Sequence, residues 1–438
     1  MAMIVLFAIL FAGIFATVPI AYCLGGAAII AMALFTPIDT VVAAQLAVTG
    51  LDSFSLLAVP FFTLAGDLMS FGGISKRIVG MMKSLIKGVV GGLAMVTTAA
   101  CAFFAALSGS GPATVSAIGT MMIPEMVKEK YDKAWATAIT CCGGVIGPII
   151  PPSIPLVLFG VIANCSIGEL FLAGVTPGIL IAVALCIYSY FSCKKHGYGV
   201  HDKNETPVEA VETEKEPELG FWRNLWSSLP ALMTPAIILG GIYTGIFTPT
   251  EAALIACVWA IIAGVFIYKE LSFRAFYESV KKSALTTATG LICIACATSF
   301  GYLLTTLQLP KKFAALLLSV SDNKYVIILF ILAFLLVLGC FLDNVTAVTI
   351  LTPMLVPIVT SLGFDLVHFG LFMTVTLAIG FVTPPYGANL FVATGITGVP
   401  ITKISKKIFP MIGVLVICLL IIVFVPQIAM WLPNVAYR

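Results

Sequence analysis

The sequence predicts an all-α polytopic membrane protein made of two inverted repeats, each with a re-entrant helical hairpin and a broken helix. Three observations predict this fold. The composition is strongly apolar, the two halves of the chain match each other at a nearly constant offset, and clusters of Gly, Pro and polar residues interrupt apolar segments at corresponding places in both halves. Paired breaks of this kind at membrane depth are typical of secondary transporters.

The composition excludes a water-soluble fold. Hydrophobic residues make up 60% of the 438 positions and charged residues only 10%, whereas soluble domains carry roughly 45–50% and about 25%. Because a membrane-spanning helix needs roughly 20 apolar residues, the chain has room for about a dozen spans. No nucleotide-binding loop and no Gly-x-Ser-x-Gly elbow occurs in the sequence, so ATP-driven and hydrolase functions have no support. We expect a lipid bilayer around the protein and no nucleic-acid partner.

The first 35 residues are almost wholly apolar but do not resemble a signal peptide. They lack a basic n-region and run roughly twice as long as a signal h-region. We expect mature membrane structure here, either one long tilted helix or two short helices that meet near Thr17–Pro19.

A polar segment divides the chain into two apolar halves. The stretch 194–218 has no apolar run and a high density of charge, which is typical of a solvated linker. We therefore assign residues 1–193 to a first repeat, 194–228 to a charged linker and 229–438 to a second repeat.

Matches between the halves indicate an internal repeat. A shift of 235 places Gly66 on Gly301, and a shift of 232 places the Gly-Ile-Phe at 13–15 on the one at 245–247. A shift of 233 places Pro124 on Pro357, Gly147 on Gly380, Pro151 on Pro384 and Pro152 on Pro385. The matches keep their order along the chain, so chance is a poor explanation.

The distribution of Lys and Arg favours inverted repeats, because cytoplasmic loops are enriched in both. The loop after Pro124 carries Lys128, Lys130 and Lys133, whereas its counterpart at 361–368 has no Lys or Arg. The next loop, at 164–169, has none, and its counterpart region carries Lys403, Lys406 and Lys407. Equivalent loops thus prefer opposite sides of the membrane. The pair Lys311 and Lys312 argues against inversion.

The first pair of interruptions comprises Ser108–Pro112 and its counterpart at 343–346. Ser, Asp and Asn cap helix N-termini, and Pro fits the first helical turn. Each cluster is therefore expected to form the tip of a re-entrant hairpin whose second arm starts there. Such an arm directs free N–H groups and the positive end of its dipole inward, which suits a carboxylate.

The second pair comprises 147–155 and 380–389, both containing Pro-Pro. Two consecutive prolines remove two N–H donors, so carbonyls of the preceding turn lose their partners. These carbonyls, together with the hydroxyls of Ser153 and Thr383, suit a hard cation such as sodium. The alternative is that all four interruptions are ordinary kinks, because Gly and Pro are common in membrane helices.

Ionisable residues at membrane depth are candidates for function. Asp343 is the best placed, and Asp67 and Glu251 qualify less well because both could sit at a helix end. The first tip contains no carboxylate or His, which favours sodium over protons as the coupling ion. Cys293 and Cys296 have redox-motif spacing, but they lie in an apolar helix and are expected to pack rather than to react.

Four motifs resemble the large membrane subunit of tripartite ATP-independent periplasmic (TRAP) transporters. They are SGSGPATV at 108–115, GPIIPPSIP at 147–155, GGIYTGIFTPTEAA at 240–253 and TPPYGANLF at 383–391. The resemblance covers essentially the whole chain. It implies an elevator-type, sodium-driven importer in the bacterial inner membrane that is not an enzyme. It also implies a small four-helix membrane subunit, here expected as a separate polypeptide, and a periplasmic binding protein that delivers a small carboxylate such as sialic acid or a C4-dicarboxylate.

The resemblance also implies the site residues, with sodium ions as the coupling ions and no other cofactor. A first sodium site would use Ser108, Ser110, Gly111, Gly147, Pro148 and Pro151. A second would use Asp343, Asn344, Thr346, Gly380, Thr383 and Pro384. Substrate would lie between the tips, near Pro112, Thr114, Ser153 and Asn389.

Three other functions remain open from the sequence. A stand-alone sodium/dicarboxylate symporter would share the hairpins and the breaks but need no binding protein. An intramembrane protease would need a Ser/His pair, paired Asp residues or a metal site at membrane depth, and no such pattern is repeated. A passive channel would not need inverted repeats with paired breaks.

Overall fold

The computed structural model describes residues 2–16, 18–85, 89–198, 221–309, 312 and 323–437. Within these ranges the chain forms helices and turns and no strand. Seven of the described helices are long and apolar enough to cross a membrane, and six further apolar helices are shorter, with 10–17 residues. The predicted all-helical membrane fold is confirmed. Several of the shorter helices are the arms of hairpins or the halves of broken helices.

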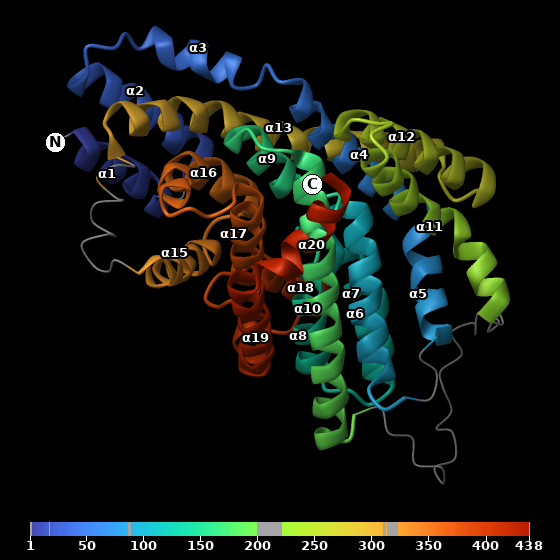
Figure 1. Ribbon diagram of the computed structural model, residues 1–438. Coiled ribbons are helices and arrows are strands. Elements are labelled where there is room, and N and C mark those ends of the chain that lie inside the picture. Colours follow the sequence, from blue (N-terminus) through green and yellow to red (C-terminus); the bar gives the residue numbers. More distant parts are fainter. Residues whose placement is uncertain are drawn as a thin grey trace.

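One set of helices forms what we call the scaffold group. It comprises α1 (Ala2–Phe15), α2 (Ile20–Phe35), α3 (Val41–Thr49), η1 (Phe54–Leu57), α4 (Ala58–Phe71), α11 (Phe221–Tyr243), α12 (Pro249–Ile262), η2 (Ala263–Ile267) and α13 (Phe273–Thr306). Figure 1 shows α3 lying along α13 at one edge of the molecule. The N-terminal segment forms two short helices that pack on each other, so the second of the two expected arrangements is correct.

The remaining helices form the hairpin group, and α5 (Ile74–Leu85) connects α4 of the scaffold group to the first helix of this group. Its first half comprises α6 (Gly92–Ser108), α7 (Gly111–Lys128), α8 (Lys133–Gly144), α9 (Ile154–Ala163) and α10 (Ile167–His196). Its second half comprises α15 (Lys324–Gly339), α16 (Asn344–Ser361), α17 (Leu366–Gly380), α18 (Ala388–Thr397), α19 (Ile401–Phe424) and α20 (Pro426–Tyr437). Both halves have the same order of hairpin, broken helix and long helix (Figure 1).

The two halves of the hairpin group pack on each other reciprocally. Helices α7 and α16 both span 18 residues, and α16 starts and ends 233 residues after α7 (111 to 344, 128 to 361). Helix α9 of the first half packs on α16, and α18 of the second half packs on α7. In the same way α10 packs on α17, and α19 packs on α8. This exchange of partners is what a two-fold relation between the repeats produces.

The contacts of α10 show that the repeats are inverted. This single helix of 30 residues is about 45 Å long. Near its last turn, Trp135 Nε1 donates to Ser192 Oγ at 3.1 Å, so α8 begins at that end. At the other end, α10 follows closely after α9, and the rings of Phe159 on α9 and Phe369 near the start of α17 have their centroids 5.9 Å apart. The equivalent helices α8 and α17 therefore run in opposite directions.

The basic residues gather at one end of the hairpin group. His368 Nε2 lies 2.9 Å from the carbonyl oxygen of Ile422, so α19 ends where α17 begins. The start of α19, with Lys403, Lys406 and Lys407, therefore lies at the same end as the start of α8, with Lys128, Lys130 and Lys133 (Figure 1). The positive-inside rule predicts that this end faces the cytoplasm. Lys311 lies outside the described residues, and Lys312 is exposed.

The expected linker at 194–228 is helical at both of its described ends. Helix α10 continues to His196 and α11 already begins at Phe221, while residues 199–220 lie outside the described part of the chain. The charges of Lys194 and Lys195 suggested a break in the helix, but basic residues are favourable in the last turn because they face the negative end of the helix dipole.

Candidate functional site

The first hairpin tip forms where α6 ends and α7 begins. Gly109 takes a left-handed conformation with φ of +59°, which lets the chain reverse, and Ser110 is the N-cap of α7. Pro112 follows in the first turn of α7, as predicted. Ser108 Oγ lies 3.1 Å from Thr114 Oγ1, and Thr114 Oγ1 donates to the carbonyl oxygen of Ser110 at 2.7 Å. The hydroxyl of Thr114, which we expected to face substrate, thus binds within the tip itself.

The first break lies directly against this tip. A Cβ atom built on Gly109 would lie 2.5 Å from the carbonyl oxygen of Pro152, and one built on Gly147 would lie 2.6 Å from the carbonyl carbon of Ser110. The fold therefore brings the first set of predicted sodium ligands together. Ser153 is the N-cap of α9, and its hydroxyl donates to the carbonyl oxygen of Pro148 at 2.5 Å. We expected this carbonyl to lack a partner, and for Pro148 that expectation is wrong.

The second tip is capped by a carboxylate. Asp343 is the N-cap of α16 and accepts a hydrogen bond from the backbone N–H of Thr346 at 3.2 Å. Asn344 is only 3% exposed, and neither atom of its side-chain amide has a hydrogen-bond partner among the described residues. A buried polar group without a partner is costly. Asn344 is therefore the residue of this tip that is best suited to a ligand.

The second break packs against the tip end of its own hairpin, where α15 ends. Gly380 meets the backbone of Gly339 on α15, and Gly387 N donates to the carbonyl oxygen of Cys340 at 3.2 Å. Thr383 Oγ1 donates to the carbonyl oxygen of Ile379 at 2.9 Å, and Pro384 is half-buried. The second set of predicted ligands is thus distributed over a tip and a break of the same repeat, as in the first half. Both Pro-Pro peptide bonds, Pro151–Pro152 and Pro384–Pro385, are cis.

Asn389 connects the two repeats. It is fully buried on α18, and its Nδ2 donates to the carbonyl oxygen of Cys141 on α8 at 3.1 Å. Its Oδ1 has no partner among the described residues, and it would lie 3.1 Å from a Cβ atom built on Gly111. The predicted substrate residue therefore points at the first tip. The sequence did not single out Cys141, whose only signal is its place before the Gly143–Gly144 pair.

The remaining candidates from the sequence, two acidic residues and two cysteines, have partners within the fold. Glu251 is exposed and forms a capping box with Thr248 at the start of α12, so it stabilises a helix end. Asp67 is largely buried on α4, and its Oδ1 lies 2.6 Å from Lys282 Nζ on α13. Cys293 and Cys296 are half-buried on α13, where the Cys296 sulfur lies near Gly25 of α2, as expected for packing residues.

The oxygen atoms at the two tips can bind a hard cation. They come from hydroxyls, amides, backbone carbonyls and one carboxylate, and such ligands suit hard cations better than soft ones. In the described part of the chain no three His, Cys, Asp or Glu side chains come together in a cluster that could hold a metal.

Comparison with known sequences decides the family. Residues 7–428 match the profile of the tripartite ATP-independent periplasmic transporter, DctM component. The chain belongs to the DctM family of TRAP transporters. It is 37% identical to the sialic acid TRAP transporter large permease protein SiaM of Vibrio cholerae over 421 residues, 96% of both chains. Members of this family are transporter permeases and not enzymes.

Other relatives carry different substrates in their names. The present chain is 45% identical over 416 residues to the isethionate TRAP transporter permease protein DctMQ of Oleidesulfovibrio alaskensis. The match covers 94% of the present chain and 64% of that longer protein. It is 33% identical to the C4-dicarboxylate TRAP transporter large permease protein DctM of Rhodobacter capsulatus, with 99% of both chains covered. The fold resembles the YdaH transporter of Alcanivorax borkumensis, with a TM-score of 0.63 at 14% identity over 91% of this chain and 90% of that one.

Proposed function

We propose that this TRAP permease takes up a small organic anion by sodium-coupled symport in the bacterial inner membrane. Its partners would be a small membrane subunit and a periplasmic binding protein that delivers the anion. The observation that carries the proposal is the contact of each tip with the break of its own repeat, with Gly147 against Ser110 and Gly380 against Gly339 at the end of α15. Each contact gathers oxygen ligands at a helix N-terminus inside the protein.

The sodium sites are proposed at these two contacts. The first would draw on the oxygens of Ser108, Ser110 and Gly147, and the second on Asp343, Asn344 and Thr346. Asn344 supports the second site most directly, because its amide oxygen is buried and unpartnered in the described residues. A bound cation would satisfy this oxygen and offset the charge of Asp343. Coupling follows if the anion binds better when both cations are present.

The anion is proposed to lie between the two tips, near Pro112, Ser153 and Asn389. The N-termini of α7, α9 and α16 carry positive partial charge, which favours a carboxylate or a sulfonate. The free Oδ1 of Asn389 lies beside Gly111 and would accept a hydrogen bond from a hydroxyl of the anion. The substrates in the relatives' names, isethionate, sialic acid and C4-dicarboxylate, are all organic anions.

An elevator movement is proposed from an asymmetry between the repeats. Gly66 on α4 lies against the first tip, with its built Cβ atom 3.1 Å from Ser108 Cα. Its counterpart Gly301 on α13 instead lies against Pro353, with its built Cβ atom 3.4 Å from Cγ. Pro353 follows the N-cap Asp343 by ten residues, about 15 Å along α16. The two repeats therefore contact the scaffold group at different depths. If the second tip took up the contact with Gly301 and the first tip gave up its contact with Gly66, the protein would face the opposite side of the membrane.

The test is uptake by reconstituted protein. The chain would be purified with its small membrane partner, placed in liposomes and supplied with radiolabelled isethionate, sialic acid or succinate. Each anion would be tried with and without an inward sodium gradient and with and without the cognate binding protein. The proposal expects uptake that requires both. Uptake without a binding protein would support a stand-alone symporter, and uptake indifferent to sodium would reject the coupling.

A further inference from the structure

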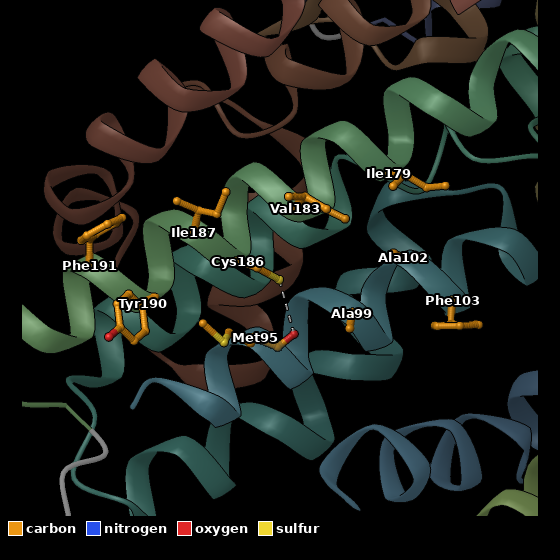
Figure 2. A pocket seen from close by; sticks show the side chains of 11 residues that line it. Met95, Ala99, Ala102, Phe103, Ile179, Val183, Cys186, Ile187, Tyr190 and Phe191 are labelled. Atoms are coloured by element: carbon orange, nitrogen blue, oxygen red, sulfur yellow. Dashed lines mark hydrogen bonds between the residues drawn. The ribbon is translucent and has the colours of Figure 1, made fainter. Parts of the chain in front are cut away.

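An apolar groove runs along the outside of the hairpin group, between α6 and α10. Its volume is about 470 Å³. Figure 2 shows Ala99 and Ala102 of α6 among the lining side chains, with Phe103, Ile187 and Phe191 also drawn around it. Where Ala side chains face a neighbouring helix they leave space that larger ones would fill. On α10, Ile187 is 53% and Phe191 64% exposed, so the groove is open to the surroundings.

The groove has the length of one leaflet of a bilayer. It extends along α10 from Ile179 to Phe191, and these twelve steps correspond to about 18 Å. Half of a hydrocarbon core of about 30 Å is about 15 Å. Phe191 precedes Ser192, the residue that meets Trp135 at the basic end of the molecule. The groove therefore lies in the cytoplasmic leaflet.

The groove is narrow for its length. A volume of about 470 Å³ spread over about 18 Å corresponds to a cross-section of about 26 Å². A groove of this cross-section can hold a single hydrocarbon chain along its length.

The cytoplasmic mouth of the groove is positively charged. Lys194 follows Tyr190 by four residues and Ile187 by seven, so it continues the stripe of α10 that lines the groove. Lys195 follows Phe191 by four residues and extends the neighbouring row. Both lysines are exposed, and in the described ranges neither forms an ion pair with a carboxylate. Each lysine at a membrane surface attracts anionic lipid.

We propose that this groove binds an anionic phospholipid of the cytoplasmic leaflet. One acyl chain would lie between α6 and α10 along the alanines, and the phosphate of the headgroup would lie at Lys194 and Lys195. The charge of the mouth decides in favour of an anionic lipid, since a zwitterionic lipid would fill the apolar part equally well. The inference does not depend on the proposed transport function, because it concerns the outer surface of the hairpin group and not the tips.

The test measures which lipid occupies the groove. A tryptophan introduced as Tyr190→Trp in the full-length chain would report on the groove in phosphatidylcholine vesicles, with the parent protein subtracted. Acyl-brominated phosphatidylglycerol, which quenches tryptophan on contact, would be compared with acyl-brominated phosphatidylcholine. We expect half-maximal quenching at about a tenfold lower mole fraction of the anionic lipid. The preference should disappear in Tyr190→Trp carrying Lys194→Gln and Lys195→Gln.

The matched control is Tyr190→Trp with Lys403→Gln and Lys406→Gln. It removes the same charge from the same end of the molecule, but from exposed positions on α19 outside the groove. This control should keep the preference. Equal quenching by both lipids, or an equal effect of the two double substitutions, would overturn the proposal. Absence of quenching by either lipid would also overturn it, because the groove would then be covered by protein.

Discussion

Gly147 of the first break lies directly against Ser110 of the first hairpin tip. A Cβ atom built on Gly147 would lie 2.6 Å from the carbonyl oxygen of Ser110 and 2.7 Å from the backbone nitrogen of Gly111. Only a residue without a side chain permits this approach of two backbones. The contact holds the proposed ligands of the first ion site in one place. Its loss should therefore weaken the binding of sodium more than it lowers the stability of the fold.

Gly147→Ala should abolish or strongly reduce uptake. The added methyl group must push the tip away from the break, which costs about 1–3 kcal/mol where the backbone cannot move freely. Uptake should be measured as a function of sodium concentration, and residual activity should need more sodium. Gly395→Ala is the control, because a Cβ atom at Gly395 meets nothing within 4 Å. Full activity with unchanged sodium dependence in Gly147→Ala would contradict the proposed site.

Asn344→Leu should stabilise the protein slightly while it abolishes uptake. The buried amide has no partner among the described residues, so an apolar side chain of similar size removes a penalty of about 1–3 kcal/mol. Thermal stability in detergent without sodium should therefore stay equal or rise. If uptake persisted, Asn344 would not belong to the site. If stability fell, the amide would have a partner that this structure does not contain.

Asn389→Leu should behave differently from Asn344→Leu. Its Nδ2 donates to the carbonyl oxygen of Cys141 at 3.1 Å, and the substitution leaves that carbonyl unpaired in a buried place. We expect a loss of about 1–3 kcal/mol in stability together with the loss of uptake. The comparison of the two leucine variants by thermal melting in the same detergent separates an amide with no bond to the protein from one that also joins the two repeats. Equal melting temperatures for both would contradict the assignment.

Sodium should raise the thermal stability of the protein, and Asp343→Ala should weaken this effect. An ion present at 100 times its dissociation constant stabilises the folded state by about 2.7 kcal/mol per site. Melting curves in sodium and in potassium at equal ionic strength measure the difference. Glu251→Ala is the control, because Glu251 is an exposed capping residue on α12. A sodium effect of equal size in both variants would exclude Asp343 from the site.

Two cysteine pairs should report opposite states of the elevator. The Cβ atom built on Gly66 lies 3.7 Å from Ser108 Cβ, within the range of about 3.5–4.5 Å for a disulfide. In a background without the 12 native cysteines, Gly66→Cys with Ser108→Cys should cross-link in the state seen here. Gly301→Cys with Phe341→Cys, the pair expected from the repeat, should cross-link only in the opposite state. If the second pair did not cross-link under any condition, this result would contradict the proposed exchange of contacts.

The positions of the tips and breaks could be predicted because their signals are local. Ser110 and Asp343 are N-caps, and the Pro-Pro pairs must interrupt a helix, so the residue types themselves indicate the geometry. The loops after Pro124 and Pro357 and those that follow them indicated the inversion, since charge reports which side of the membrane a loop occupies, although Lys311 and Lys312 argued against it. These are properties that a residue has irrespective of its distant neighbours.

The contacts across the repeats could not be predicted in this way. The bond from Asn389 to Cys141 joins residues 248 positions apart, and nothing in either local sequence indicates the partner. Thr114 was expected to face substrate, but its hydroxyl has the carbonyl of Ser110 within reach one turn earlier in the helix. The end of the first repeat was placed at residue 193, although α10 continues to His196 because its last turn tolerates lysines.

The central claim is that sodium bound at the two tips drives the anion inward. The most direct measurement is the paired flux of labelled sodium and labelled anion in the same liposomes, for the parent complex and for Ser110→Ala and Asp343→Ala. The account predicts that sodium enters with the anion in the parent, and that each substitution lowers the number of sodium ions taken up per anion. Anion uptake at the full rate with no entry of sodium would contradict it.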